Sequence, residues 1–144
     1  MVDVHIIVGV AVILGNAVTG VWGGASWYLR RPSVGFWYSL RVAQVVVVIQ
    51  AAVGSVLLLQ GREAVDGLHY VYGVLPVLVA LVAEGGRIAA SEHELEGLDL
   101  ESLPRERQRA VAMAISRRET GIMAVSALVI LGLALRAAFL SPAV

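Results

Sequence analysis

The sequence contains no cysteine and no lysine, and only 15% of its 144 residues are charged. The absence of cysteine excludes disulfide bonds, thiolate metal sites, iron–sulfur clusters and covalently attached c-type haem. All 11 basic residues are arginine, and 11 acidic residues balance them to a formal net charge of zero. Because a neutral chain lacks a basic field, we expect no nucleic-acid partner. Any redox function would require a non-covalent cofactor.

Hydrophobic residues make up 58% of the chain, and the mean hydropathy is +0.81. Soluble domains contain about 45–50% apolar and about 25% charged residues. The apolar residues form four long runs, and a helix of about 20 apolar residues crosses the hydrocarbon core of a bilayer. We therefore expect an all-α membrane protein, a single domain whose apolar surface faces lipid. The expected spans are residues 5–28, 34–60, 65–89 and 121–140.

Arginine is distributed unevenly among the connections between these runs. Most of it lies in the connections that follow the first and third runs, whereas the connection after the second run contains Arg62. Arginine accumulates on the cytoplasmic side of membrane proteins, so the connections after the first and third runs are predicted to be cytoplasmic. Both termini then lie outside, and the spans form an antiparallel four-helix transmembrane bundle.

The only long polar segment, residues 91–119, separates the third run from the fourth, and it is acidic in its first half and basic in its second. Ser102 followed by Pro104 is typical of a helix start, and no strong helix breaker except Gly121 follows before the fourth run. We therefore expect a long helix that projects into the cytoplasm and runs into the fourth span. With the segment before it, this helix forms a cytoplasmic helical hairpin in which the acidic half can fold back on the basic half. It is interpreted either as a solvated hairpin or as a docking surface for a partner. Arginines beside the membrane can also bind anionic lipid headgroups.

Two residues of opposite charge are expected inside the membrane near the cytoplasmic face. Arg41 lies about seven residues into the second span, and Glu84 lies about five residues before the end of the third. Because an isolated charge in a span is costly, an intramembrane ion pair is the simplest arrangement. Gln44 is three residues from Arg41 on the same helix face and is expected to complete the hydrogen bonding. The pair is interpreted either as a clamp that fixes helix register or as part of a proton or ion pathway.

Three further ionisable residues are expected near the outer face. His5 opens the first span, His69 lies near the start of the third, and Arg136 lies near the end of the fourth. Two imidazoles from two helices at matched depth are what axial ligation of one b-type haem requires. Arg136 can pair with a haem propionate, and Tyr72 or Asn16 can orient a ligand histidine. The only metal ligands expected are therefore His5 and His69, through haem iron.

The same residues allow two other interpretations. A quinone-like ligand can bind between His69 and Arg136, or the histidines can be interfacial anchors without a ligand. The first span also carries a face of small residues, including Gly20 and Gly23, which favours close helix packing or a flat ligand. A membrane hydrolase is disfavoured, because the serines of the spans have no histidine at their depth.

The sequence thus favours a small membrane subunit that holds one haem b, or a quinone-like ligand, near its outer face. Its role would be electron transfer or that of an accessory subunit in a respiratory complex. The alternative from another class is a non-catalytic scaffold without a cofactor. Its partners would be the lipid bilayer, another membrane protein or a second copy of the chain.

One segment of the third span reads Leu68-His69-Tyr70-Val71-Tyr72-Gly73-Val74-Leu75-Pro76. Together with Ala83-Glu84, Arg87-Ile88-Ala89, Arg117-Arg118-Glu119 and Leu135-Arg136-Ala137-Ala138, it resembles a group of uncharacterised small four-span bacterial membrane proteins. The resemblance implies a bacterial inner (plasma) membrane location and no particular activity. It also implies that the His69 segment, Glu84 and Arg136 are distinctive positions of the group. In architecture alone, the chain resembles small b-type membrane cytochromes, with fewer histidines than the di-haem kind.

Overall fold

The computed structural model describes residues 1–64 and 66–140, which form four long α-helices, one short 3-10 helix and no strand. The helices are α1 (Val2–Tyr28), α2 (Val34–Leu59), α3 (Leu68–Leu95) and α4 (Arg105–Leu140), and the 3-10 helix η1 spans Leu100–Ser102. All four long helices are long and apolar enough to cross a membrane. The shortest has 26 residues, which at 1.5 Å per residue extends about 39 Å and exceeds a hydrocarbon core of about 30 Å. The prediction of an all-helical protein with four membrane-length helices is confirmed.

The last two helices differ from the expected spans. α3 continues past residue 89 to Leu95. α4 begins at Arg105, ahead of the apolar run that starts at residue 121, which confirms the helix start predicted from Ser102 and Pro104. The expected start of the third span, Val65, lies outside the described residues. The carbonyl oxygen of Pro104 accepts a hydrogen bond from the backbone N–H of Gln108 at 3.0 Å, which opens α4. The basic segment and the fourth span are therefore one continuous helix, because no residue between them interrupts it.

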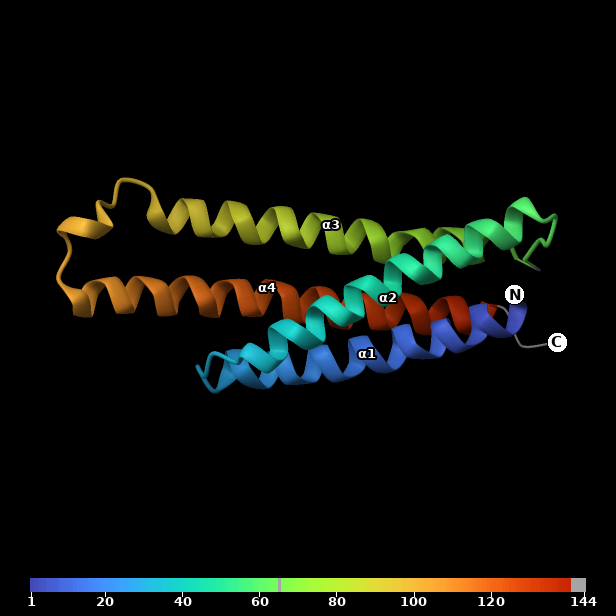
Figure 1. The fold of residues 1–144 in the computed structure, drawn as a ribbon, viewed down its shortest axis with the longest axis horizontal. Helices are drawn as coiled ribbons and strands as arrows, with labels where there is room; N and C mark the ends of the chain where they lie inside the picture. Colours follow the sequence, from blue (N-terminus) through green and yellow to red (C-terminus); the bar gives the residue numbers. More distant parts are fainter. Residues whose placement is uncertain (65, 141–144) are drawn as a thin grey trace.

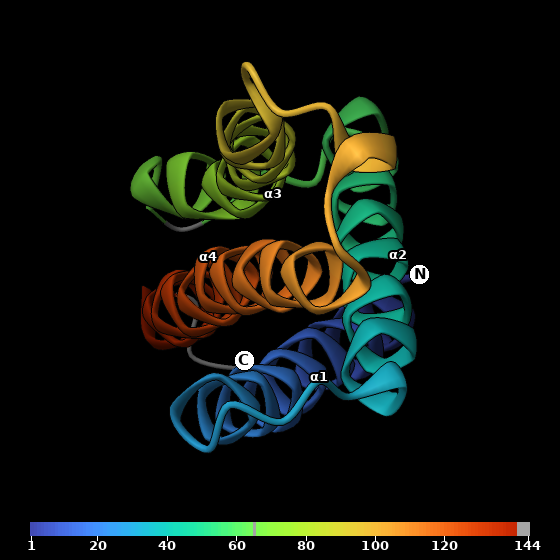
Figure 2. The ribbon, with the colours of Figure 1, turned by 90° about the vertical axis from the view of Figure 1, so that its left-hand side faces the viewer.

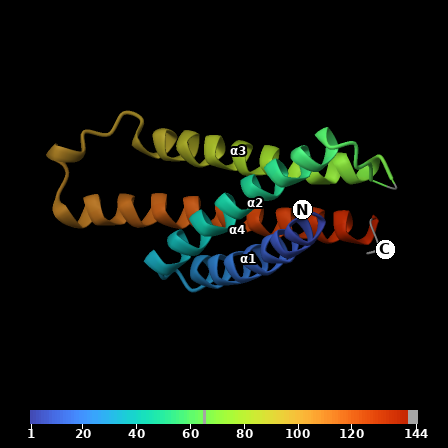
Figure 3. The same ribbon diagram turned by 45° about the vertical axis from the view of Figure 1, so that its right-hand side comes forward.

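The long helices run back and forth along the long axis of the molecule (Figure 1). α4 lies between α1 and α3, and α2 crosses one side of this layer obliquely (Figure 2). α3 and α4 continue together beyond the turn that joins α1 to α2 (Figure 3). The start of α1, the end of α2, the start of α3 and the end of α4 therefore lie at the same end of the molecule (Figure 1).

Two small clusters of buried side chains hold the helices together. The first consists of Phe36, Leu40, Ala83 and Met123, and the second of Val12, Val47 and Ile130. Each cluster takes its side chains from three helices. Other large apolar side chains lie on the outer surface, where Ile7, Val21 and Val82 are well exposed. Such outward-facing apolar side chains suit contact with lipid, and van der Waals packing then drives association of the helices.

Glycines bring α1 close to its neighbours. A Cβ atom on Gly20 would lie 2.5 Å from Cδ2 of Leu128, and one on Gly23 would overlap the ring of Phe36 and lie 2.8 Å from Cβ of Ala124. Real Cβ atoms do not approach other carbons so closely, so the backbone of α1 is in contact with these side chains. The small-residue face of the first span therefore serves close helix packing at Gly20 and Gly23, and no room remains there for a flat ligand.

The turn after α1 contains an arginine in the left-handed backbone conformation. Arg30 has a φ of 53°, in a region that helix ends usually give to glycine. Its N–H donates to the carbonyl of Trp27 at 3.3 Å, and the N–H of Arg31 donates to the carbonyl of Ser26 at 3.0 Å. These two bonds close the last turn of the helix. A non-glycine residue in this conformation costs about 1–2 kcal/mol of backbone strain. Arg30 therefore carries a strain that glycine at the same position would avoid.

The acidic end of α3 lies against the basic part of α4. Nη1 of Arg118 lies 2.5 Å from Oε1 of Glu94, and the two residues come from the two arms of the hairpin. The loop at the tip is tied down by Gln108, whose side-chain amide donates to the carbonyls of Leu100 and Leu103 at 2.8 and 3.0 Å. The two halves of segment 91–119 thus make side-chain contacts with each other.

Candidate functional site

Side chains from three helices and a carbonyl from the fourth meet at the end of the molecule where α1 begins. We call this group the histidine cluster, and it consists of His5, Gln50, His69 and the backbone carbonyl of Ala137. The ring centroids of His5 and His69 lie 6.0 Å apart, with ring planes inclined by 57°. Nε2 of Gln50 lies 3.3 Å from Nε2 of His5, and Nδ1 of His69 lies 3.2 Å from the oxygen of Ala137. All four helices therefore contribute to one polar group.

Two glycines make room for this cluster. A Cβ atom on Gly9 would lie 3.1 Å from Nε2 of Gln50, and one on Gly54 would lie 3.2 Å from Cε1 of His5. Gly9 follows His5 by four residues and Gly54 follows Gln50 by four, so each glycine shares a helix face with one polar residue. Each glycine also faces the polar residue of the other helix. Larger residues at either position would push the two side chains apart.

The contact with Ala137 determines the tautomer of His69. A carbonyl oxygen can only accept a hydrogen bond, so Nδ1 of the neutral ring carries the proton and Nε2 has the lone pair. Histidines that ligate a metal are commonly oriented in this way through their other ring nitrogen. The contact thus assigns His69 the tautomer with its proton on Nδ1.

Two buried atoms of the cluster, Nδ1 of His5 and Oε1 of Gln50, have no hydrogen-bond partner among the described residues. The oxygen and nitrogen of a glutamine amide can be exchanged without changing its shape. With its oxygen toward His5, the amide accepts a hydrogen bond from Nε2–H and leaves the lone pair on Nδ1. A buried polar atom without a partner costs about 1–3 kcal/mol. This end of the helices thus offers polar atoms to a ligand.

The spacing of the two imidazoles suits a single haem iron. Bonds from a metal to an imidazole nitrogen are about 2 Å long, so two rings on opposite sides of one metal have centroids about 6 Å apart. The observed separation of the His5 and His69 centroids is 6.0 Å. No group of three or more His, Cys, Asp or Glu suited to a bare metal ion occurs within residues 1–64 and 66–140. The donor set is thus two imidazoles, which is the number that axial ligation of one haem uses and fewer than the ligands of a zinc site.

Arg136 and Tyr72 lie near the cluster in the sequence without hydrogen bonds to it. Arg136 immediately precedes Ala137, and its side chain is exposed. None of the ion pairs in the described part of the chain includes it. Tyr72 follows His69 by three residues and is half-buried. Arg136 is thus available at the surface, and Tyr72 stands one helical turn from a cluster histidine.

Asn16 lies away from the histidines. It follows His5 by 11 residues, which places it about 16 Å further along α1. Its side chain is buried, and its amide donates to the carbonyl of Val12 at 2.9 Å. The structure therefore does not bring Asn16 to either ring, because its polar group is satisfied within its own helix.

A second polar site joins α2, α3 and α4 nearer the turn that follows α1. We call it the arginine–glutamate network, and it consists of Arg41, Gln44, Glu84, Arg87, Ser91 and Glu119. Arg41 and Glu84 form an ion pair. Gln44 accepts from Nη1 of Arg41 at 2.7 Å and donates to Oε1 of Glu84 at 2.9 Å. The structure thus brings together the three residues that the sequence places at one depth.

Arg87 and Glu119 extend the network to α4. Nε of Arg87 lies 3.0 Å from Oε2 of Glu84, and its Nη1 lies 3.1 Å from Oε1 of Glu119. The hydroxyl of Ser91 donates to the same oxygen of Glu119 at 2.6 Å. Cζ of Arg87 lies 5.7 Å from the ring centroid of Trp37 on α2. Two arginines and two glutamates cancel in charge, which reduces the cost of holding them between apolar helices.

Sequence reasoning missed Gln50 and the partnership of Arg87 with Glu119. Gln50 is one of few polar residues in an apolar stretch of α2, and that contrast was the available signal. Glu119 was assigned to the polar segment, because the membrane boundary was drawn between it and the fourth span.

Comparison with known protein families, with curated proteins and with solved structures finds no match to this chain. Its function is therefore inferred from the two sites themselves.

Proposed function

We propose that the chain spans the inner (plasma) membrane of a bacterium as an antiparallel four-helix bundle, with both termini outside and the α3–α4 hairpin in the cytoplasm. The back-and-forth course of the helices supports this arrangement (Figure 1). Arginines are concentrated between residues 105 and 118, and arginine accumulates on the cytoplasmic side. The histidine cluster then lies near the outer face and the arginine–glutamate network nearer the inner face.

Within this arrangement, the histidine cluster is assigned to one b-type haem, in electron transfer or in an accessory subunit of a respiratory complex. The observation that carries the proposal is the 6.0 Å separation of the His5 and His69 ring centroids across two helices. The two imidazoles would hold the iron from its two sides. Gln50 and the carbonyl of Ala137 would orient the rings through their other nitrogens. When bound, a haem supplies one-electron redox chemistry.

The described residues provide axial ligands for a single haem. The third histidine, His93, is exposed near the end of α3, where its Nδ1 lies 3.4 Å from a carboxylate oxygen of Glu96. One haem near the outer face does not carry an electron across a hydrocarbon core of about 30 Å. The redox role therefore requires a donor and an acceptor on the same side of the membrane. This requirement favours an accessory subunit over a transmembrane electron carrier.

A quinone-like ligand is the second candidate for the same cluster. The buried atoms Nδ1 of His5 and Oε1 of Gln50, which have no partner among the described residues, support it. A quinone carbonyl accepts a hydrogen bond, and a quinol hydroxyl also donates one. Binding of this kind needs the polar atoms of His5 and Gln50 and no iron.

The absorption spectrum of protein purified after expression with ample haem tests the haem proposal. We expect a Soret band that is lost in His5→Ala and in His69→Ala. The matched control is His93→Ala, which removes an exposed imidazole and should leave the band unchanged. A purified protein without a Soret band, or a band unaffected by His69→Ala, would overturn the proposal. Organic extraction and mass spectrometry of the same samples would then detect a bound quinone, which Gln50→Leu should deplete.

A non-catalytic scaffold is the alternative from another class, and the arginine–glutamate network favours it. Its ion pairs link α2, α3 and α4, and the α3–α4 hairpin extends beyond the α1–α2 turn (Figure 3). Replacing residues 97–103 with a Gly-Ser linker of equal length removes η1 and leaves α3 and α4 in place. The scaffold predicts that a co-purifying membrane partner is lost, with no change in the absorption spectrum. Unchanged co-purification would contradict it.

A further inference from the structure

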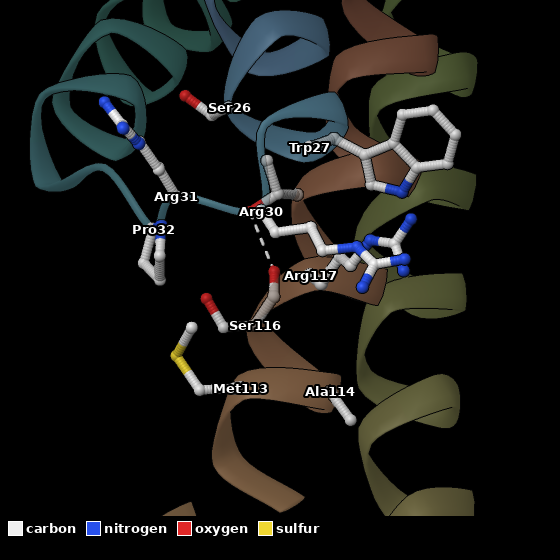
Figure 4. Close-up of a pocket in the computed structure, with 10 residues that line it drawn as sticks. Ser26, Trp27, Arg30, Arg31, Pro32, Met113, Ala114, Ser116 and Arg117 are labelled. Carbon is white, nitrogen blue, oxygen red and sulfur yellow. Dashed lines mark hydrogen bonds between the residues drawn. The ribbon is translucent and has the colours of Figure 1, made fainter. Parts of the chain in front are cut away.

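A cavity of about 210 Å³ lies beside the turn between α1 and α2, at the opposite end of α1 from His5 (Figure 4). Its walls come from the end of α1, the turn that follows and the middle of α4. Arg30, Arg31 and Arg117 supply the charged part of its lining. Among the described residues, no acidic side chain lines it. The cavity is therefore distinct from both the histidine cluster and the arginine–glutamate network, and it is strongly positive.

These arginines are not neutralised within the described part of the chain. None of its ion pairs includes Arg30, Arg31 or Arg117. Cζ of Arg117 instead lies 5.4 Å from the ring centroid of Trp27. In Figure 4, the side chains of Arg30 and Arg117 extend toward the same side as Trp27, and Arg31 extends away from them. Two guanidinium groups are thus directed to one side of the turn, which favours an anionic ligand.

The backbone of the turn provides a second, independent observation. Arg30 adopts a φ of 53°, where glycine would be free of strain. A residue held in a strained backbone conformation is typical of functional sites. The hydrogen bonds that close the turn use only backbone atoms of residue 30, so they do not require an arginine there. The conformation of the turn therefore does not account for an arginine at position 30.

The apolar residues that line the cavity, and its position at the end of α1, indicate which kind of anion it fits. Trp27, Pro32 and Met113 give the cavity an apolar wall. The cavity lies where the apolar sequence of α1 ends at paired arginines, a position typical of the membrane–water interface, where tryptophan is enriched. A ligand that matches this wall carries a negative group and an apolar portion together. Among phosphate-bearing ligands, a membrane phospholipid meets both requirements, whereas free phosphate meets only the first.

We infer that this cavity binds the headgroup of an anionic phospholipid. Arg30 and Arg117 contact the phosphate, because guanidinium groups bind phosphate oxygens through paired, charge-assisted hydrogen bonds. Trp27 and Met113 contact the adjoining apolar part of the lipid. The site goes beyond the haem proposal, and it stands whether or not the histidine cluster binds a cofactor.

Native mass spectrometry of the full chain, extracted from bilayers that contain phosphatidylglycerol and phosphatidylcholine, tests this inference. We expect phosphatidylglycerol to be retained in preference to phosphatidylcholine. Its retention should fall about tenfold, or about 1.4 kcal/mol, in the double variant Arg30→Gln/Arg117→Gln. The matched control is Arg107→Gln/Arg109→Gln, which makes the same change in charge at exposed positions of α4 outside the cavity. The control should retain phosphatidylglycerol as the wild type does.

A second variant separates lipid binding from folding. Arg30→Gly relieves the backbone strain at this position, so we expect it to be at least as thermally stable in lipid-free detergent as the wild type. It should nevertheless lose selective retention of phosphatidylglycerol. Equal loss in the double variant and in the control would overturn the inference, as would undiminished retention in Arg30→Gly. Thermal stabilisation by inorganic phosphate alone, equal to that by phosphatidylglycerol, would assign the site to a free anion and also overturn it.

Discussion

Nε2 of Gln50 lies 3.3 Å from Nε2 of His5, although 45 residues separate the two in the chain. The contact joins α1 to α2 at the end of the molecule where His69 and Ala137 also meet. A glutamine amide that touches an imidazole nitrogen holds the ring in one orientation. Gln50 thus contacts the His5 ring from the neighbouring helix.

Replacing Gln50 with leucine should loosen whatever ligand the histidine cluster holds. Loss of a group that orients a ligating histidine typically weakens metal binding about 10- to 100-fold. We expect haem retention in Gln50→Leu to fall within this range, measured by titration of the apoprotein with haem. Gln60→Leu is the control, because Gln60 is exposed at the end of the same helix. Equal affinity in the two variants would show that Gln50 does not act on His5.

Removing the charge of Glu84 should destabilise the protein more than removing that of Arg41. Glu84 has two arginine partners, and its side chain is 24% exposed, whereas that of Arg41 is 50% exposed. Glu84→Gln therefore leaves two arginines without their shared carboxylate, at a cost of about 1–3 kcal/mol in the free energy of unfolding. Arg41→Gln leaves Glu84 paired with Arg87 and should cost less, because the carboxylate keeps a charged partner.

Unfolding in detergent, followed by circular dichroism, measures this order. Glu106→Gln is the control, because it removes a carboxylate at an exposed position in the first turn of α4. We expect it to change stability by less than either network variant. An equal or larger loss of stability in Arg41→Gln than in Glu84→Gln would contradict the shared-carboxylate geometry.

Two adjacent glycines of α1 should respond in opposite directions to the same substitution. A Cβ atom on Gly23 would overlap the fully buried ring of Phe36, whereas one on Gly24 would have no neighbouring atom within 4 Å. Gly23→Ala should therefore destabilise the protein by about 1–3 kcal/mol through overpacking. Gly24→Ala should be neutral or stabilising, since alanine favours helix over glycine by about 1 kcal/mol. Thermal denaturation of both variants in one detergent checks the pair, and equal melting temperatures would contradict the close packing of α1.

The absence of native cysteine makes the proposed topology directly testable. Glu63→Cys places a single thiol in the turn between α2 and α3, and Glu101→Cys places one in the tip of the hairpin. In spheroplasts, whose inner membrane is intact and whose outer face is accessible, a membrane-impermeant maleimide should label Glu63→Cys and not Glu101→Cys. Permeabilised cells should show labelling of both. Labelling of Glu101→Cys in spheroplasts would place the hairpin outside.

Much of the architecture could be predicted from local sequence. The apolar runs are long enough to cross a membrane, so their length and composition alone indicate four helices. The first two helices end within one residue of their predicted ends. The continuous helix from Arg105 into the fourth run was predictable from the helix start at Ser102–Pro104 and the lack of a strong breaker after it. The length of α3 was underestimated, because apolarity marks where a helix can meet lipid and not where its backbone hydrogen bonding stops.

The sites were predictable only in part. Counting residues from the end of a span gives depth, and depth alone suggested that Arg41 could reach Glu84 and that His5 could reach His69. Depth did not reveal that Gln50 turns toward His5, nor that Asn16 bonds within its own helix. These outcomes depend on how each helix is rotated about its axis.

By itself, the sequence determined that this chain is built from four long apolar helices, and it gives the position of each charged residue along its helix. That position follows from the rise of about 1.5 Å per helical residue, which is a local property of the backbone. Only the tertiary structure decided which side chains face one another across the helices, such as Gln50 and His5, or Arg87 and Glu119. The rotation of each helix is decided by close contacts such as that of Gly23 with Phe36, whose two residues come from different helices. Such contacts arise only when all four helices pack together, so no local stretch of sequence contains them.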